Sequence, residues 1–163
     1  MKRLWAPWRM EYILEAQDSN ESCIFCDKPK EKNDAKNLIV YRSDLCFVIL
    51  NKYPYNNGHL MIVPYVHESD YAKLTADIAM DMHDVIRRSV LTLQNTIKPH
   101  GLNIGINLGR TAGAGIDDHL HYHIVPRWNG DTNFMPIISE TKVVSEALQE
   151  TWKILHHEFK KQS

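Results

Sequence analysis

Short apolar runs in the first half of the chain are separated by polar turn sequences, which is typical of an antiparallel sheet. Residues 38–41 and 46–50 are apolar, and the polar segment 42–44 lies between them. This arrangement predicts a β-hairpin. A third apolar run at 59–63 follows the Pro, Asn and Gly residues of 54–58, so we expect a third strand after a turn.

The middle of the chain changes to a helical pattern. Between residues 71 and 98 apolar side chains recur at intervals of three and four, and Pro99 ends the run. The pattern predicts a long amphipathic helix whose apolar stripe packs on the core. The residues of this stripe are Leu74, Ile78, Met82, Val85, Ile86, Leu93 and Ile97.

Two more strands and one more helix are expected in the second half. Residues 103–108 and 119–126 have strand-like patterns and flank a glycine-rich connection. On the last helix we expect His156 and His157 to be solvated. The apolar face of that helix would consist of Leu148, Trp152, Leu155 and Phe159.

Strands before and after a single long helix indicate an α+β fold, with an antiparallel sheet covered by helix on one side. The chain has 163 residues and 44% hydrophobic content, which is enough for one domain with its own core. Residues 1–22 are rich in Trp, Arg and Glu and are expected to form an N-terminal arm, with a single domain over 23–163.

Composition excludes several classes of partner. A net charge of -1 and a pI of about 6.7 give no electrostatic footprint for nucleic acid, so any phosphate binding must be local. We find no signal-peptide pattern and no membrane-spanning segment, which predicts a cytoplasmic protein without a membrane partner. Three cysteines in that compartment are expected to be reduced thiols or metal ligands.

Three histidines alternate with apolar residues near the end of the glycine-rich connection. His119, His121 and His123 would line one face of a strand, with about 6.6 Å between successive Cα atoms. A neutral imidazole can attack phosphorus, and its neighbours can donate hydrogen bonds to phosphate oxygens or protonate a leaving group. A half-exposed strand without a chemical role stays open as an alternative. So does a three-histidine metal site, although it lacks a suitably placed carboxylate.

Five of the seven glycines lie between residues 101 and 115. In the connection 109–115 their backbone N–H groups can approach an anion closely, so Gly113, Ala114 and Gly115 are candidate phosphate contacts. The segment is not a Walker loop, because no Gly-Lys-Ser/Thr follows it. A flexible connection between strands is the alternative.

Cys23 and Cys26 form a Cys-x-x-Cys pair that could hold zinc if two more ligands lie nearby. Inert thiols and a redox pair are the alternatives, and the proline and charges of 27–36 disfavour the redox pair. Cys46 lies within an apolar strand and is expected in the core.

The triad resembles the histidine-triad superfamily of nucleotidyl hydrolases and transferases, whose motif is His-φ-His-φ-His-φ-φ. The apolar positions here are Leu120, Tyr122, Ile124 and Val125. The blocks 51–54 and 58–64 are similar to the first block of that family, and 23–26 is similar to the knuckle of its zinc-bearing members. The tail 126–135 is similar to the branch of diadenosine tetraphosphate phosphorylases or hydrolases. The resemblance implies a histidine-triad fold in which two subunits of a homodimer join sheets edge to edge.

The resemblance also implies a chemistry. His121 would attack the α-phosphorus of a dinucleoside polyphosphate or nucleotide phosphoramidate, with its Nδ1–H held by a backbone carbonyl, and water or phosphate would release the nucleotide. His123 would contact phosphate and leaving-group oxygens, and His59 matches the fourth histidine of the family. His123 favours hydrolysis, whereas the tail 128–135 favours phosphorolysis. A largely non-catalytic nucleotide-binding module is the rival function.

The remaining site residues follow from the same resemblance. Structural zinc would be bound by Cys23, Cys26, His67 and His119, and no catalytic metal is implied. Asn51 matches a position that contacts ribose or phosphate. Asn103 and Asn107 are candidates for similar contacts or for structural hydrogen bonds. Gly115 and Ile116 stand where family members commonly carry Gln-Ser or Gln-Thr, so a side-chain hydroxyl contact to phosphate is in doubt.

Overall fold

The computed structural model of the protein describes residues 23–131 and 147–162, and the segments expected to form the N-terminal arm (1–22) and the end of the tail (132–135) lie outside this part. Five strands form one sheet: β1 (Ile39–Arg42), β2 (Cys46–Leu50), β3 (Leu60–Pro64), β4 (Gly101–Ile106) and β5 (Tyr122–Arg127). The helices are α2 (Ile24–Asp27), α3 (Asp34–Asn37), α4 (Ala76–Thr96) and α6 (Leu148–Lys161), with short 3-10 turns at Lys28–Glu31, Tyr71–Lys73 and Arg110–Ala112.

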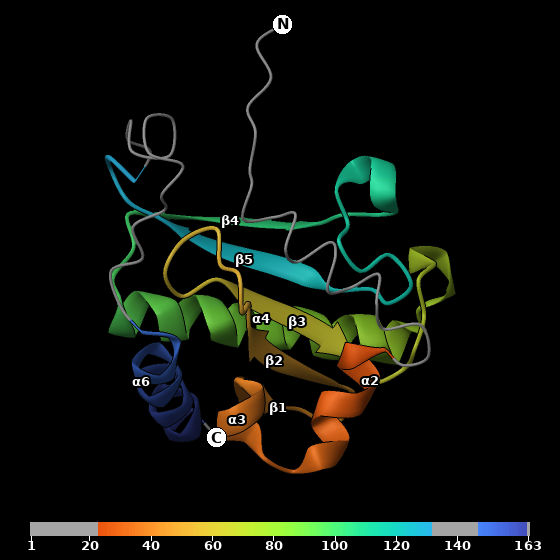
Figure 1. Ribbon diagram of the computed structural model, residues 1–163, viewed down its shortest axis with the longest axis horizontal. Helices are drawn as coiled ribbons and strands as arrows, with labels where there is room; N and C mark the ends of the chain where they lie inside the picture. The colour runs from red at the N-terminus through yellow and green to blue at the C-terminus, as the bar shows by residue number, and fades with distance from the viewer. Residues whose placement is uncertain (1–22, 132–146, 163) are drawn as a thin grey trace, which may run out of the picture.

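The strand order is β1-β2-β3-β5-β4, and every pairing is antiparallel. The expected α+β class and the hairpin at 39–50 are therefore confirmed. Strand β3 is buried along its whole length and lies between β2 and β5. β4 forms one edge of the sheet (Figure 1), as the strand order requires. Four of its six residues are exposed.

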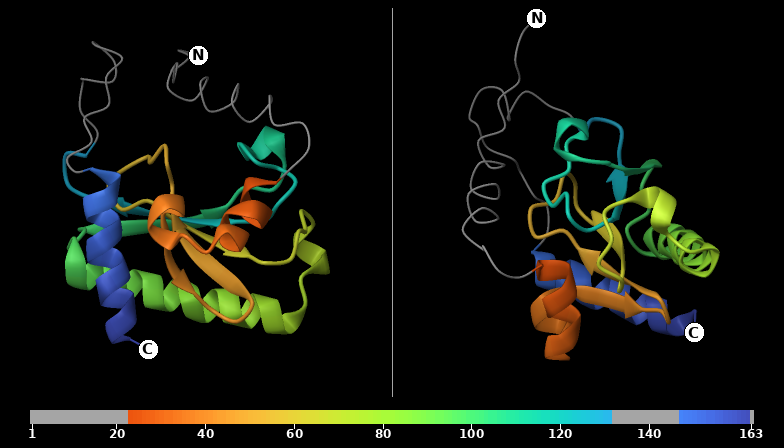
Figure 2. Two further views of the ribbon diagram at one scale, coloured as in Figure 1. Left: turned by 60° about the horizontal axis from the view of Figure 1, so that its bottom comes forward. Right: turned by 90° about the vertical axis from the view of Figure 1, so that its right-hand side faces the viewer.

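Helix α4 lies along one face of the sheet, whereas α2 and α3 lie on the other side (Figure 2). Its buried residues include Met82, Val85 and Leu93, which follow the predicted stripe. The helix begins at Ala76 rather than near residue 71, because the Thr75 hydroxyl accepts a hydrogen bond from the Ile78 N–H and caps the first turn. No helix in the described ranges is both long and apolar enough to cross a membrane.

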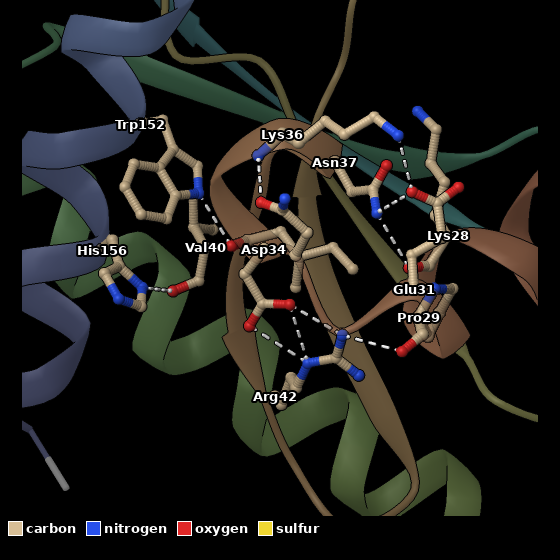
Figure 3. Close-up of polar contacts among 12 residues, drawn as sticks. Lys28, Pro29, Glu31, Asp34, Lys36, Asn37, Val40, Arg42, Trp152 and His156 are labelled. Atoms are coloured by element: carbon tan, nitrogen blue, oxygen red, sulfur yellow. Dashed lines mark hydrogen bonds and ion pairs between the residues drawn. The ribbon is translucent and has the colours of Figure 1, made fainter.

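Helix α6 packs against β1 through its apolar face, where Phe159 stacks on Tyr41 with ring centroids 5.0 Å apart. Two polar side chains of α6 also bond to β1 (Figure 3). The register shifts within β1, and there the Trp152 Nε1–H donates to the Ile39 carbonyl oxygen (2.8 Å) while His156 Nδ1 donates to that of Val40 (2.8 Å). The two rings stack at 4.6 Å. The expectation that His156 is solvated was wrong, because its ring satisfies a backbone carbonyl at an irregular strand.

The segment before β1 is also tied down. The Arg42 guanidinium contacts both carboxylate oxygens of Asp34 and donates to the Pro29 carbonyl oxygen (3.0 Å), and Asn37 Nδ2 donates to the carbonyl oxygen of Lys28 (3.1 Å; Figure 3). These contacts hold the short α2–α3 segment, which carries the two knuckle cysteines, against the sheet.

Candidate active site and metal centre

The triad segment begins before its strand. Only His123 lies within β5, where it is opposite Met61 of β3 and Gly105 of β4. Strand pairing starts at Tyr122 rather than at residue 119, because the N–H of Leu120 donates to the carbonyl oxygen of Glu68 (2.8 Å) in the loop after β3. The expected start of the strand was therefore wrong by three residues.

The three histidine rings still form a connected row. The ring centroids of His121 and His123 are 4.8 Å apart. Phe25 of α2 contacts both His119 and His121, with centroids 5.5 Å and 5.1 Å away. His119 and His121 are buried, which leaves them little contact with solvent.

Backbone geometry fixes the tautomer of His121. Its Nδ1 lies 2.9 Å from the carbonyl oxygen of His119, and a carbonyl can only accept, so Nδ1 carries the proton. The lone pair of the neutral ring is then on Nε2. Burial lowers the pKa of His121, which favours this neutral form at pH 7. The ring is therefore in the state that a nucleophile toward phosphorus requires.

His59 joins the row from the position just before β3. It is fully buried, and its Nδ1 accepts a hydrogen bond from the backbone N–H of Tyr55 (3.1 Å). A neutral His59 then carries its proton on Nε2, which lies 3.0 Å from Nδ1 of His123. His123 accepts this hydrogen bond at Nδ1, so its own proton is on Nε2.

A second cluster surrounds the other end of the row. One ligand atom from each of Cys23, Cys26, His67 and His119 lies within 4.8 Å of the others. His119 Nδ1 is 3.3 Å from Cys23 Sγ and 3.7 Å from Cys26 Sγ, and His67 Nδ1 is 3.3 Å from Cys26 Sγ. Ligands of a tetrahedral zinc, with bonds of about 2.3 Å to sulfur and about 2.0 Å to nitrogen, lie roughly 3.5 Å apart. The cluster has the donor set and the spacing of a metal site.

Neighbouring groups determine the protonation of two of these ligands. His119 Nε2 donates to the carbonyl oxygen of Pro64 (2.9 Å), which leaves Nδ1 unprotonated and directed at the cysteines. Burial raises the pKa of Cys23 to about 11, and a cation at this position would oppose that effect and favour the thiolate. Cys23, Cys26 and Cys46 are all free, and Cys46 is buried in β2 as expected.

Sequence comparison identifies the family of this chain. Residues 32–130, well over half of the chain, match the HIT domain. The chain belongs to the HIT family. It is 40% identical over 169 residues to a protein of Mycobacterium tuberculosis named AP-4-A phosphorylase, an alignment that covers 99% of this chain and 86% of that protein.

Solved HIT structures have the same fold. A zinc-bound histidine triad family protein from Mycobacterium smegmatis matches with a TM-score of 0.68 and 25% identity, over 86% of this chain and 95% of that one. A histidine triad nucleotide-binding protein from Sulfolobus tokodaii matches with a TM-score of 0.69 and 28% identity, over 85% and 93% of the two chains.

The three asparagines expected to contact the substrate of this HIT protein differ in their hydrogen bonds and burial. Asn51 Oδ1 accepts from the N–H of Tyr53 (2.9 Å), which shapes the turn after β2. Asn103 Oδ1 accepts from Arg127 (2.9 Å), so Asn103 makes a structural hydrogen bond. Asn107 is half-buried beyond the end of β4.

The glycine-rich connection of the HIT protein contains a short 3-10 turn rather than open strand. Gly113 ends this turn with φ of 99°, which glycine adopts without strain, and the N–H of Ala114 donates to the carbonyl oxygen of Gly109 (3.3 Å). Arg110 pairs with Asp117 (2.9 Å), so this acidic residue stabilises the loop.

Three contributors to the HIT site were missed by sequence reasoning. Phe25 was noted only as part of the knuckle, although its ring contacts two triad histidines. Asn56 and Asp131 were not singled out, although they join the turn before His59 to the end of β5. Of these three residues, only Phe25 could have been selected from the sequence, because it lies between Cys23 and Cys26.

Proposed function

We propose that this HIT protein transfers a nucleotidyl group from a dinucleoside polyphosphate, such as diadenosine tetraphosphate, to His121. The observation that carries the proposal is the hydrogen bond from His121 Nδ1 to the His119 carbonyl oxygen, which leaves Nε2 as the nucleophile. The name of the Mycobacterium tuberculosis relative supports the substrate class. Nucleotide phosphoramidates are the second substrate class.

The reaction has two steps. In the first, the Nε2 lone pair of His121 attacks the α-phosphorus, and the bond to the bridging oxygen breaks. His123 donates a hydrogen bond from Nε2 to oxygens on which charge develops. In the second, an acceptor displaces the nucleotide from His121, and the electron pair of the phosphorus–nitrogen bond returns to Nε2. Inorganic phosphate is the acceptor that the relative's name favours, and water is the alternative.

The other binding residues have supporting roles in this proposal. Asn51, Asn103 and Asn107 contact the ribose or the phosphates. Of the loop residues Gly113, Ala114 and Gly115, Gly115 contacts the phosphate through its backbone N–H, because the N–H groups of Gly113 and Ala114 are donated to the carbonyl oxygens of Arg110 and Gly109. These contacts would bind the substrate in either step.

Cys23, Cys26, His67 and His119 hold a structural zinc ion in this proposal. The ligand spacing and the zinc-bound HIT structure support this assignment. When bound, zinc supplies a rigid link between the knuckle and the triad segment and takes no part in bond breaking.

The assembly and location are proposed from the same family relationship. The exposed edge of β4, where Ile104 is 47% exposed, is suited to pair with β4 of a second subunit and form a homodimer. Replacement of Ile104 by Glu should then shift the mass measured by light scattering toward the monomer. We also propose an N-terminal arm (1–22), a single domain (23–163) and a cytoplasmic location without nucleic-acid or membrane partners.

The deciding experiment is incubation with diadenosine tetraphosphate, with and without phosphate, followed by identification of products. AMP and ATP indicate hydrolysis, and ADP and ATP indicate phosphorolysis. Acid-quenched samples should contain a nucleotidyl adduct whose peptide maps to His121. Tight nucleotide binding without cleavage of any P–O–P or P–N bond would instead support a nucleotide-binding module.

A further inference from the structure

Polar side chains tie the turn before β3 to the end of β5. Asn56 Nδ2 donates to the carbonyl oxygen of Pro126 (3.0 Å) and to Asp131 Oδ2 (2.7 Å). Asp131 is in turn held by a two-point ion pair with Arg127 (2.5 and 2.9 Å). The backbone carbonyl of Asn56 accepts from the N–H of His59 (3.2 Å). We call Asn56, Asp131 and Arg127 the Asn56 clamp.

The residue next to the clamp, Tyr55, supplies the backbone N–H that sets the proton positions of two histidines. The N–H of Tyr55, adjacent to Asn56, donates to His59 Nδ1, and a backbone N–H can only donate. The proton of His59 is therefore on Nε2 and is donated to His123 Nδ1 (3.0 Å). A doubly protonated His123 would place two N–H groups face to face. The arrangement thus keeps His123 neutral, with its proton on Nε2.

The proton on Nε2 of His123 affects the two possible acceptors, water and inorganic phosphate, differently. Once the nucleotidyl group is on His121, its Nε2 is bonded to phosphorus and its Nδ1–H is bound to the His119 carbonyl oxygen. Nε2 of His123 already bears a proton. Neither ring can then remove a proton from attacking water. A phosphate dianion forms its new P–O bond without losing a proton, so it needs no base.

We propose that Asn56 is a positioning residue that, through Tyr55 and His59, makes inorganic phosphate a better acceptor than water at nucleotidyl-His121. This inference rests on the proposed function, because it concerns the fate of that intermediate. Release of the Tyr55 N–H would let His59 carry its proton on Nδ1. His123 could then donate from Nδ1 and present an unprotonated Nε2 to water.

The test is the ratio of AMP to ADP formed from diadenosine tetraphosphate at one fixed phosphate concentration. Asn56→Ala should raise this ratio about fivefold or more, since general-base assistance to water is worth about 10²-fold or more when fully available. The ratio is internal to each sample, so a smaller active fraction does not change it. Tyr55→Pro keeps the clamp but deletes the N–H, and should raise the ratio as well.

Thr151→Val is the matched control. Thr151 of α6 donates from Oγ1 to Oδ1 of Asn57 (3.1 Å), which lies in the same turn as Asn56, and the substitution removes this contact. The Tyr55–His59 contact stays in place, so the ratio of AMP to ADP should keep its wild-type value. An unchanged ratio in Asn56→Ala would overturn the role of Asn56, an unchanged ratio in Tyr55→Pro would overturn the role of the Tyr55 N–H, and an equal rise in Thr151→Val would overturn both. A wild-type protein that forms no nucleotidyl-His121 would contradict the proposed function instead.

Discussion

Gly58 immediately precedes His59 and leaves no room for a side chain. Its φ is +73°, and a Cβ added there would lie 2.5 Å from Ile97 Cδ1 and 3.3 Å from Leu93 Cδ2. The positive φ should cost an alanine about 1–2 kcal/mol. The overlap is with the terminal methyl of the half-buried Ile97 side chain, and displacing that side chain should cost about 1–3 kcal/mol more. We therefore expect Gly58→Ala to lower the free energy of unfolding by about 2–5 kcal/mol.

A double mutant separates these two contributions. Ile97→Val deletes Cδ1 and should by itself cost about 0.5–1.5 kcal/mol. In that background Gly58→Ala should cost the backbone strain, about 1–2 kcal/mol, and the smaller remaining contact with Leu93 Cδ2. The difference between the two costs measures the steric overlap.

Urea unfolding followed by tryptophan fluorescence measures all four variants of this cycle. Trp152, which contacts β1, is a suitable reporter of the folded state. A loss below about 0.5 kcal/mol for Gly58→Ala would refute the reasoning, because surface substitutions reach that value. An equal loss with Ile97 and with Val at position 97 would refute the steric part alone.

Three further predictions concern the nucleophile, the metal site and the clamp. His121→Gly should lower turnover by about 10⁴-fold while nucleotide binding stays within about tenfold, as measured by product formation and calorimetry; a residual rate above about a tenth of wild type would exclude His121 as nucleophile. Protein purified without chelator should contain one zinc per chain by elemental analysis; Cys23→Ser should lower both zinc content and Tm, whereas Cys46→Ala should keep the zinc, and less than about 0.2 zinc per wild-type chain would reject the site. The ion pair with Arg127 lowers the pKa of Asp131, so the stability it contributes is present above about pH 4 and is lost as pH falls further. The stability difference between wild type and Asp131→Asn in urea unfolding should therefore shrink toward pH 3 or so, and a constant difference would contradict this assignment.

Much of the fold could be predicted because the apolar pattern has a local cause. The apolar runs at 38–41 and 46–50 correspond to β1 (Ile39–Arg42) and β2 (Cys46–Leu50), and the helical stripe corresponds to α4. Boundaries were less accurate, because they depend on partners distant in sequence. β4 begins at Gly101, two residues earlier than expected, since it pairs with Arg127 at the far end of β5.

In the site, too, the features that depend on local sequence could be predicted and those that depend on distant contacts could not. The spacing of the triad and of Cys23 and Cys26 is local, so the sequence indicated both clusters. The hydrogen bonds that select the tautomers come from the backbone carbonyl oxygens of His119 and Pro64, which any residue type can supply, and from the backbone N–H of Tyr55, which every residue type except proline can supply. Composition therefore carries no signal for them. Asn56 and Asp131 are 75 residues apart, and only the folded chain brings them together.

The position of β3 has a consequence for how this protein can change during evolution or design. His59 lies just before the strand and Pro64 ends it, so the length of β3 sets the separation between the His59–His123 pair and the carbonyl that orients His119. A one-residue insertion within β3 would move the side chains that follow it to the opposite face of the sheet and would also displace one of these two partners. Selection can therefore exchange side chains along β3, but changes in chain length are confined to the loops.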